Sequence, residues 1–176
     1  MELIIMILII FFTIILLIYN NLVKKKNAVK QSRSSINIYL LQRFNLIPNL
    51  VECVKAYTKH EKDIFVDITK LRAEYEQTKQ LEKASELNTQ INNLLLISEN
   101  YPNLKSSENF LNLQKNLSKI EDQLQAARRL YNTDVTNYNT SLQTFPNNII
   151  AAIFRFKKED LFNITPLESE NPKISF

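Results

Sequence analysis

The first twenty residues are almost entirely apolar. The run from Leu3 to Ile18 contains one polar side chain, Thr13, whose hydroxyl can return to the carbonyl oxygens of its own helix. A helix needs about 20 such residues, at about 1.5 Å each, to cross a hydrocarbon layer about 30 Å thick. Glu2 precedes the run and three lysines follow at positions 24–26, which reverses the charge order of a secretory signal peptide. The pattern predicts a transmembrane anchor at residues 1–20; a buried core helix and a cleaved signal are the alternatives.

Beyond the anchor, apolar residues recur at spacings of three and four, which indicates amphipathic helices. The first helix is expected to continue from the anchor through Leu40, since no proline or glycine intervenes. A second is expected from Ile47, with Asn45 as its cap and Pro48 in its first turn, along one unbroken stripe to Tyr75. That stripe comprises Ile47, Leu50, Val54, Tyr57, Glu61, Ile64, Ile68, Leu71 and Tyr75.

Two further helices complete the pattern. The third spans residues 81–95 and is followed by a turn rich in Asn, Pro and Ser over residues 98–109. The fourth starts at a serine cap, Ser106 or Ser107, and keeps the three-and-four spacing until Pro146 stops it. Long helices joined by short turns bury their stripes most simply as an antiparallel bundle. The prediction is an all-α chain in which a transmembrane helix continues into an antiparallel four-helix bundle.

Composition narrows the possible chemistry. The 176 residues include no glycine, one cysteine and one histidine. Glycine-rich phosphate loops therefore cannot form, and the usual zinc sites lack ligands. The net charge of +4 is modest and its cations are interleaved with glutamates, so nucleic-acid binding is not expected. We expect no catalytic residues, no metal and no cofactor, and the chain is interpreted as not an enzyme.

The pair His60-Glu61 is the most conspicuous polar pair on the second helix. An HExxH zinc site needs a second histidine, and Cys53 lies about 10 Å away along the helix axis, too far for a nucleophile relay. Glu61 interrupts the apolar stripe, and a carboxylate facing other helices needs a cationic partner. We therefore predict either a solvated Glu61 or an interhelical ion pair with one of four arginines. The candidates are Arg33, Arg43, Arg128 and Arg129.

A polar ridge is predicted on the fourth helix. Tyr131 and Tyr138 are seven residues apart, as are Asn132 and Asn139, so each pair returns to nearly one face. One interpretation is core tyrosines whose hydroxyls reach the edge of the bundle. The other is a ridge of Asn132, Asn139 and Arg128 that receives a partner's backbone or a lipid headgroup.

The C-terminal segment, residues 147–176, is the expected contact surface. It is apolar over Ile149 to Phe156 and then basic. The segment is expected to fold back onto the bundle, and the alternative is that it lies at the membrane interface. Its candidate contact residues are Ile153, Phe154, Phe156, Lys157 and Lys158.

Several motifs resemble those of the LemA family of bacterial membrane proteins. They are YNNLVKKKNAV at residues 19–29, IPNLV at 47–51, the pair HE at 60–61, YPNLK at 101–105, ARRLYN at 127–132, YN at 138–139, FP at 145–146 and the closing NPKISF. The resemblance covers nearly the whole chain. It implies a transmembrane anchor, here residues 1–20, and a cytoplasmic four-helix bundle, here 21–146, but no established molecular activity.

The functional expectation follows from this organisation. We expect a single-pass protein of the inner membrane with its N-terminus outside and the bundle in the cytoplasm, because the lysines after the anchor hold that side inside. Its expected role is a protein-interaction adaptor or scaffold, with membrane lipid and unidentified proteins as partners. The alternative is a membrane-organising protein that acts by self-association and lipid contact through the C-terminal segment.

Overall fold

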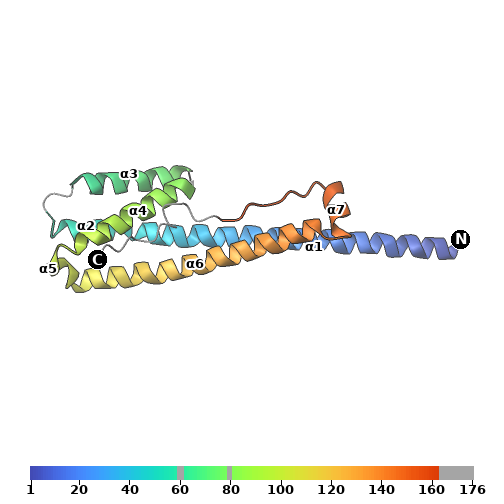
Figure 1. Cartoon of the computed structure of the whole chain (residues 1–176), viewed down its shortest axis with the longest axis horizontal. Helices are drawn as coiled ribbons and strands as arrows, with labels where there is room; N and C mark the ends of the chain where they lie inside the picture. The colour runs from blue at the N-terminus through green and yellow to red at the C-terminus, as the bar shows by residue number, and fades with distance from the viewer. Residues whose placement is uncertain (59–61, 79–80, 163–176) are drawn as a thin grey trace, which may run out of the picture. The chain divides into compact units, whose positions relative to one another are not determined.

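The computed structural model describes residues 1–58, 62–78 and 81–162. Within these ranges the regular elements are all α-helices and there is no strand, as the sequence predicts. The helices are α1 (Glu2–Asn45), α2 (Ile47–Lys55), α3 (Lys62–Thr78), α4 (Leu81–Ser98), α5 (Pro102–Lys105), α6 (Glu108–Gln143) and α7 (Asn147–Ile153) (Figure 1).

Helix α1 runs without interruption from the apolar N-terminus into the polar part of the chain, which confirms the predicted continuity. The side chains of residues 1–14 are all exposed, and Thr13 Oγ1 donates a hydrogen bond to the carbonyl oxygen of Ile9 (2.8 Å). The apolar part of α1 is long enough and apolar enough to cross a membrane. Exposed apolar side chains on every face of a helix are suited to lipid rather than to water.

The single helix predicted from Ile47 to Tyr75 is wrong, because α2 ends at Lys55. The backbone N–H groups of Tyr57 and Thr58 both donate to the Val54 carbonyl oxygen (3.0 and 3.1 Å), and Thr58 Oγ1 does so as well (3.1 Å). Three donors thus satisfy one carbonyl of the last turn, and this tight turn replaces the continuing helix. Tyr57, expected in the buried stripe, is 41% exposed.

The expected cap of α2 is also wrong, whereas the boundaries of α6 agree with prediction. Leu46, not Asn45, precedes α2, and no side chain caps it, although Pro48 lies in the first turn. At α6, Ser107 Oγ accepts a hydrogen bond from the Phe110 N–H (3.3 Å), as expected of an N-cap. Pro146 follows the end of α6 and directly precedes α7.

The chain divides into two compact units. Among the described residues, the first unit comprises 1–36 and 125–162. In it α1 and α6 run antiparallel (Figure 1): Leu22 of α1 packs in one cluster with Leu142 of α6, and the charge of Arg33, eleven residues after Leu22, acts on Tyr131, eleven residues before Leu142. Helix α7 completes this cluster with Ile150 and the neighbouring Ala151.

The second unit comprises residues 37–124 outside the two gaps. Helices α3 and α4 lie side by side in it (Figure 1). The rings of Phe44 and Tyr75 meet edge to face with centroids 4.8 Å apart. Its buried apolar side chains come from every helix of the unit: Leu40, Phe44, Ile47, Leu50, Val51, Val54, Phe65, Ile68, Tyr75, Ala84, Leu87, Ile91, Leu94, Leu104, Phe110, Leu117 and Leu124.

Candidate functional site

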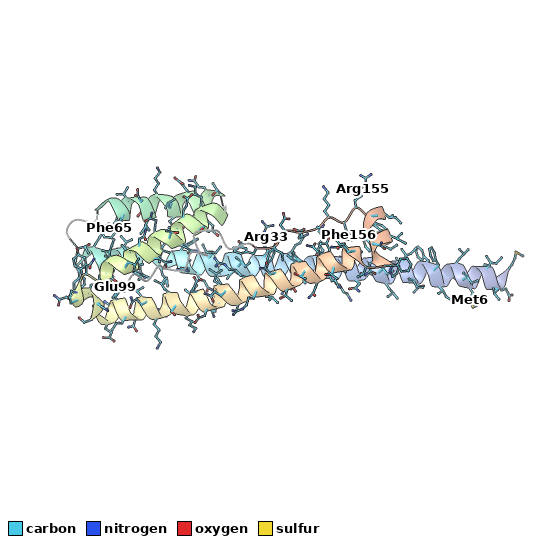
Figure 2. All side chains as sticks on the ribbon, viewed as in Figure 1. Met6, Arg33, Phe65, Glu99, Arg155 and Phe156 are labelled. Carbon is cyan, nitrogen blue, oxygen red and sulfur yellow. The ribbon has the colours of Figure 1, made fainter. Side chains whose placement is uncertain are left out.

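The site is formed where the chain turns back after α7 and runs along α6. The turn is a Schellman motif: the Arg155 N–H donates to the carbonyl of Ala152 (3.2 Å) and the Phe156 N–H to that of Ala151 (2.9 Å). Arg155 takes the left-handed conformation (φ 55°) that glycine usually supplies, in a chain without glycine. In Figure 2 Arg155 points away from the ribbon and Phe156 toward α1. We call the following residues, 157–162, the strap.

Two asparagines of α6 each hold one residue of the strap by its main chain. Asn139 Nδ2 donates to the carbonyl of Glu159 (2.7 Å), and the Glu159 N–H donates to Asn139 Oδ1 (3.0 Å). Asn132 repeats the pattern at Phe162, with distances of 3.1 Å and 2.8 Å. A side-chain amide here satisfies one backbone donor and one backbone acceptor together, as a neighbouring strand would.

Two tyrosines of α6 add one contact each. The Tyr138 hydroxyl donates to the carbonyl of Lys157 (3.0 Å), and the Tyr131 hydroxyl donates to the carbonyl of Asp160 (3.0 Å). Both rings are buried. We call Tyr131, Asn132, Tyr138 and Asn139 together the ladder, because all six of these hydrogen bonds join it to main-chain atoms of the strap.

The spacing of the ladder matches the spacing of an extended chain. Seven helical residues advance about 10.5 Å at about 1.5 Å each. Three extended residues advance about 10 Å at about 3.3 Å each. The tyrosines and the asparagines are each seven apart, and their strap partners, 157 with 160 and 159 with 162, are each three apart. One Tyr-Asn pair per two helical turns therefore stays in register with every third strap residue.

The electrostatics keep both hydroxyls protonated. Burial raises the pKa of Tyr138 above its ordinary value, and the Glu159 carboxylate raises it further. Burial is also the main cause of the raised pKa of Tyr131; the cation Arg33 opposes it, while Glu159 and Asp160 reinforce it. Because a phenolate cannot donate, the raised pKa values extend the pH range over which the two tyrosine contacts persist to pH values above about 10, where a free tyrosine loses its proton.

Aromatic rings flank the ladder contacts at both ends. Phe156, just before the strap, meets the ring of Tyr19 (centroids 5.8 Å apart), and Lys26 Nζ lies 5.8 Å from its centroid. Phe162, at the other end, lies under the guanidinium of Arg128 at 5.0 Å. The ridge predicted from Asn132, Asn139 and Arg128 therefore receives main chain and an aromatic ring, and these come from the chain itself.

The arginines predicted to pair with Glu61 have different surroundings. Arg43 forms an ion pair with Glu121 of α6, and its Nη2 donates to Asn92 Oδ1 of α4 (3.4 Å). This is an interhelical ion pair within the second unit, with a partner that the sequence did not indicate. Arg33 and Arg129 are exposed on their helices. His60 and Glu61 lie outside the described residues, so the proposed pairing of Glu61 stays a prediction.

The predicted C-terminal contact residues divide between two environments. Phe156 packs with the cluster of Tyr19, Leu22 and Ile150. Ile153, Phe154, Lys157 and Lys158 have exposed side chains. Sequence reasoning identified the ridge through its seven-residue repeat but not its occupant, because the strap sequence KKEDLF (residues 157–162) has no periodic signal that pairs it with α6.

Comparison with known proteins gives relatives for most of the chain. Residues 32–176 match the model of the LemA family. Protein LemA of Metamycoplasma hominis is 26% identical over 147 residues, which are 81% of this chain and 65% of that protein. Magnetosome protein MamQ 2 of Paramagnetospirillum magneticum is 29% identical over 73 residues, 42% of this chain and 27% of that protein. Magnetosome protein MamQ of Magnetospirillum gryphiswaldense is 27% identical over 73 residues, with the same coverage.

Proposed function

The chain belongs to the LemA family, and we propose from its geometry that it is a membrane-anchored adaptor, not an enzyme, whose helix α6 binds extended peptide segments. The observation that carries the proposal is the ladder: Asn132 and Asn139 each pair with the N–H and the C=O of one strap residue. Surface asparagines on a helix are normally satisfied by water, so two that each pair twice with one extended segment amount to a binding surface for main chain.

The proposed ligand is an extended peptide of a partner protein that replaces the strap. All six ladder contacts go to backbone atoms, which every peptide carries except at proline. Selectivity for particular peptides then comes from the two ends of the ladder. There the ring of Phe156 contacts the ring of Tyr19, and the ring of Phe162 contacts the guanidinium of Arg128. The preferred ligand is an extended segment with aromatic residues six positions apart.

The proposal includes the placement of the adaptor. The lysines at positions 24–26, with Lys30 and Arg33, support a topology in which the N-terminus lies outside and the rest of the chain lies at the inner face of the membrane. It also includes the antiparallel four-helix bundle, which the antiparallel run of α1 and α6 and the contact of α3 with α4 favour. An anchor of this kind raises the local concentration of whatever the ladder binds.

A competition experiment on the full chain in detergent micelles tests the ladder. The strap is tethered, so it competes at an effective concentration on the order of millimolar. Phe162→Ala weakens the tethered copy and leaves the ladder intact. We expect a labelled peptide of residues 155–162 to bind the Phe162→Ala protein measurably more tightly than the wild type. Adding Asn132→Leu and Asn139→Leu should abolish this binding.

The control is a substitution on α6 outside the ladder. Asn137→Leu changes an exposed asparagine of the same helix and should leave peptide binding as it was. If the peptide fails to bind the Phe162→Ala protein while hydrogen exchange shows its strap released, α6 is not a peptide-binding surface. In intact cells, cross-linking should then enrich defined proteins with the wild-type chain but not with the asparagine variants; self-cross-links and lipid adducts alone would favour the membrane-organising alternative.

A further inference from the structure

Helix α7 lies beside the last part of the apolar run of α1. Its buried residues Ile150 and Ala151 pack with Leu22, and Ile15, Ile18 and Tyr19 of α1 contact the same cluster. These α1 contacts extend over the eight residues from Ile15 to Leu22, or about 10 Å along the helix axis. They coincide with the end of the apolar run, where a helix spanning the hydrocarbon layer passes into the headgroup region.

Other apolar side chains of α7 and its two flanks are exposed, among them Phe154, although its ring also contacts the ring of Tyr19 (centroids 4.7 Å apart). Ile153 is 65% exposed, Phe145 80%, Phe154 51% and Ile149 50%. In water four such side chains on one short segment are unfavourable, since exposed aliphatic and aromatic surface loses the free energy of burial in proportion to its area. We call these four residues the α7 face. Its continuity with the exposed apolar surface of α1 points to one environment for both.

The chain next to the α7 face is basic. Residues 144–158 contain Arg155, Lys157 and Lys158 and no acidic residue before Glu159, and residues 3–36 of α1, in the same unit, likewise contain none. Lysines 24–26 begin two residues after Leu22, which packs on α7. Basic residues next to an apolar surface at the end of a membrane span attract anionic headgroups.

We propose that the α7 face is a second membrane-binding site, in which Phe145, Ile149, Ile153 and Phe154 insert at the boundary between headgroups and acyl chains of a bilayer that contains anionic lipid. The depth expected for such an interfacial segment is about 5 to 10 Å. The site is independent of the ladder, so it holds whether or not α6 binds a partner. It fixes the C-terminal part of α6 and the start of the strap close to the membrane surface.

Tryptophan reporters test this proposal on the full chain, which contains no tryptophan of its own. Ile153→Trp is reconstituted in vesicles of phosphatidylcholine with phosphatidylglycerol, with lipids brominated near the headgroup end of the acyl chains as quenchers. The matched control is Leu130→Trp, an exposed leucine of the same unit. It lies twelve residues before Leu142, or about 18 Å along α6. Circular dichroism checks that both variants fold.

The expected result is strong bromolipid quenching and poor acrylamide quenching of Trp at 153, with the opposite behaviour at 130. Phe154→Trp should agree with Ile153→Trp, which guards against an effect of one substitution. The proposal is overturned if the reporters at 153 and 154 respond to both quenchers as the reporter at 130 does. Quenching at 153 should weaken in vesicles of phosphatidylcholine alone and after Lys157→Gln with Lys158→Gln; equal quenching in all of these would overturn the requirement for anionic lipid.

Discussion

Replacing Asn139 by leucine should loosen the strap without unfolding the helix that carries it. The substitution removes both hydrogen bonds to Glu159, each worth about 1 kcal/mol net, so the strap loses about 2 kcal/mol. Leucine is a better helix former than asparagine by a few tenths of a kcal/mol, which favours α6 slightly. The stability of the helix and the stability of the strap should therefore change in opposite directions.

The free energy that favours the ordered strap is small, so this loss should be large enough to detect. Ordering six residues costs about 6 to 12 kcal/mol in backbone entropy, at about 1 to 2 kcal/mol each. Six hydrogen bonds at about 1 kcal/mol each, with the partial burial of Phe156 and Phe162, return a similar amount. An ordered segment that is favoured by only a few kcal/mol opens more often when two of its hydrogen bonds are lost.

Hydrogen exchange at single amides is the suitable assay, because the N–H groups of Glu159 and Phe162 in the strap donate directly to the asparagine oxygens of the ladder. In the full chain in micelles, Asn139→Leu should speed exchange at Glu159 about 30-fold, the equivalent of 2 kcal/mol. Phe162 should accelerate as well, because the strap opens as a unit. Asn137→Leu is the control and should change neither amide. Equal exchange at Glu159 in the wild type and the Asn139→Leu variant would refute the assignment of these contacts.

Three further predictions concern the turn, the tyrosines and the buried ion pair. Arg155→Gly should raise the stability of the first unit by up to about 1 kcal/mol in a thermal melt, since glycine takes a positive φ without the cost to a side-chain-bearing residue; a lower Tm would contradict the left-handed turn. The raised pKa values of Tyr131 and Tyr138 mean that their contribution to stability is complete below pH of about 10 and is lost as pH rises through the folded-state values. A tyrosinate absorbance titration should therefore show late-titrating groups that diminish after Tyr131→Phe with Tyr138→Phe, and an unchanged titration would refute this. Glu121→Gln should destabilise the second unit by about 1 to 3 kcal/mol in chemical denaturation, less than for a fully buried pair because the glutamate side chain is 30% exposed, and Arg43→Met with Glu121→Leu should recover most of that loss; equal stability of the single variant and the wild type would show that the pair contributes nothing.

The elements that the sequence predicted correctly are those set by local chemistry. The absence of proline and glycine allowed α1 to continue past its apolar N-terminal run, Ser107 capped α6, and Pro146 followed its end. The break after Lys55 was missed because the apolar stripe continues through the turn at the same spacing. Periodicity reports which face would be buried if a helix formed, and it does not report where backbone donors converge on one carbonyl, as they do at Val54.

The sequence predicted the ridge on α6 but not the segment that binds to it. The repeat of Tyr131 and Asn132 at Tyr138 and Asn139 is a local property of one helix, and it indicated a polar ridge. The partner of that ridge lies 19 to 30 residues further along the chain and is recognised by main-chain atoms, which leave no mark on the strap's sequence. The ion pair of Arg43 is a similar case, since charge alone could not choose Glu121 from the other carboxylates of the chain.

The ladder separates what holds the strap from what the strap displays. Its contacts end at main-chain atoms, while the side chains of Lys157, Lys158, Asp160 and Leu161 project to the outside. Substitutions at these four positions can therefore change the local charge or apolarity of the surface without disturbing the conformation that carries it. In evolutionary terms, related chains can change the exposed side chains of the strap without losing its conformation, provided that the two Tyr-Asn pairs beneath it are kept.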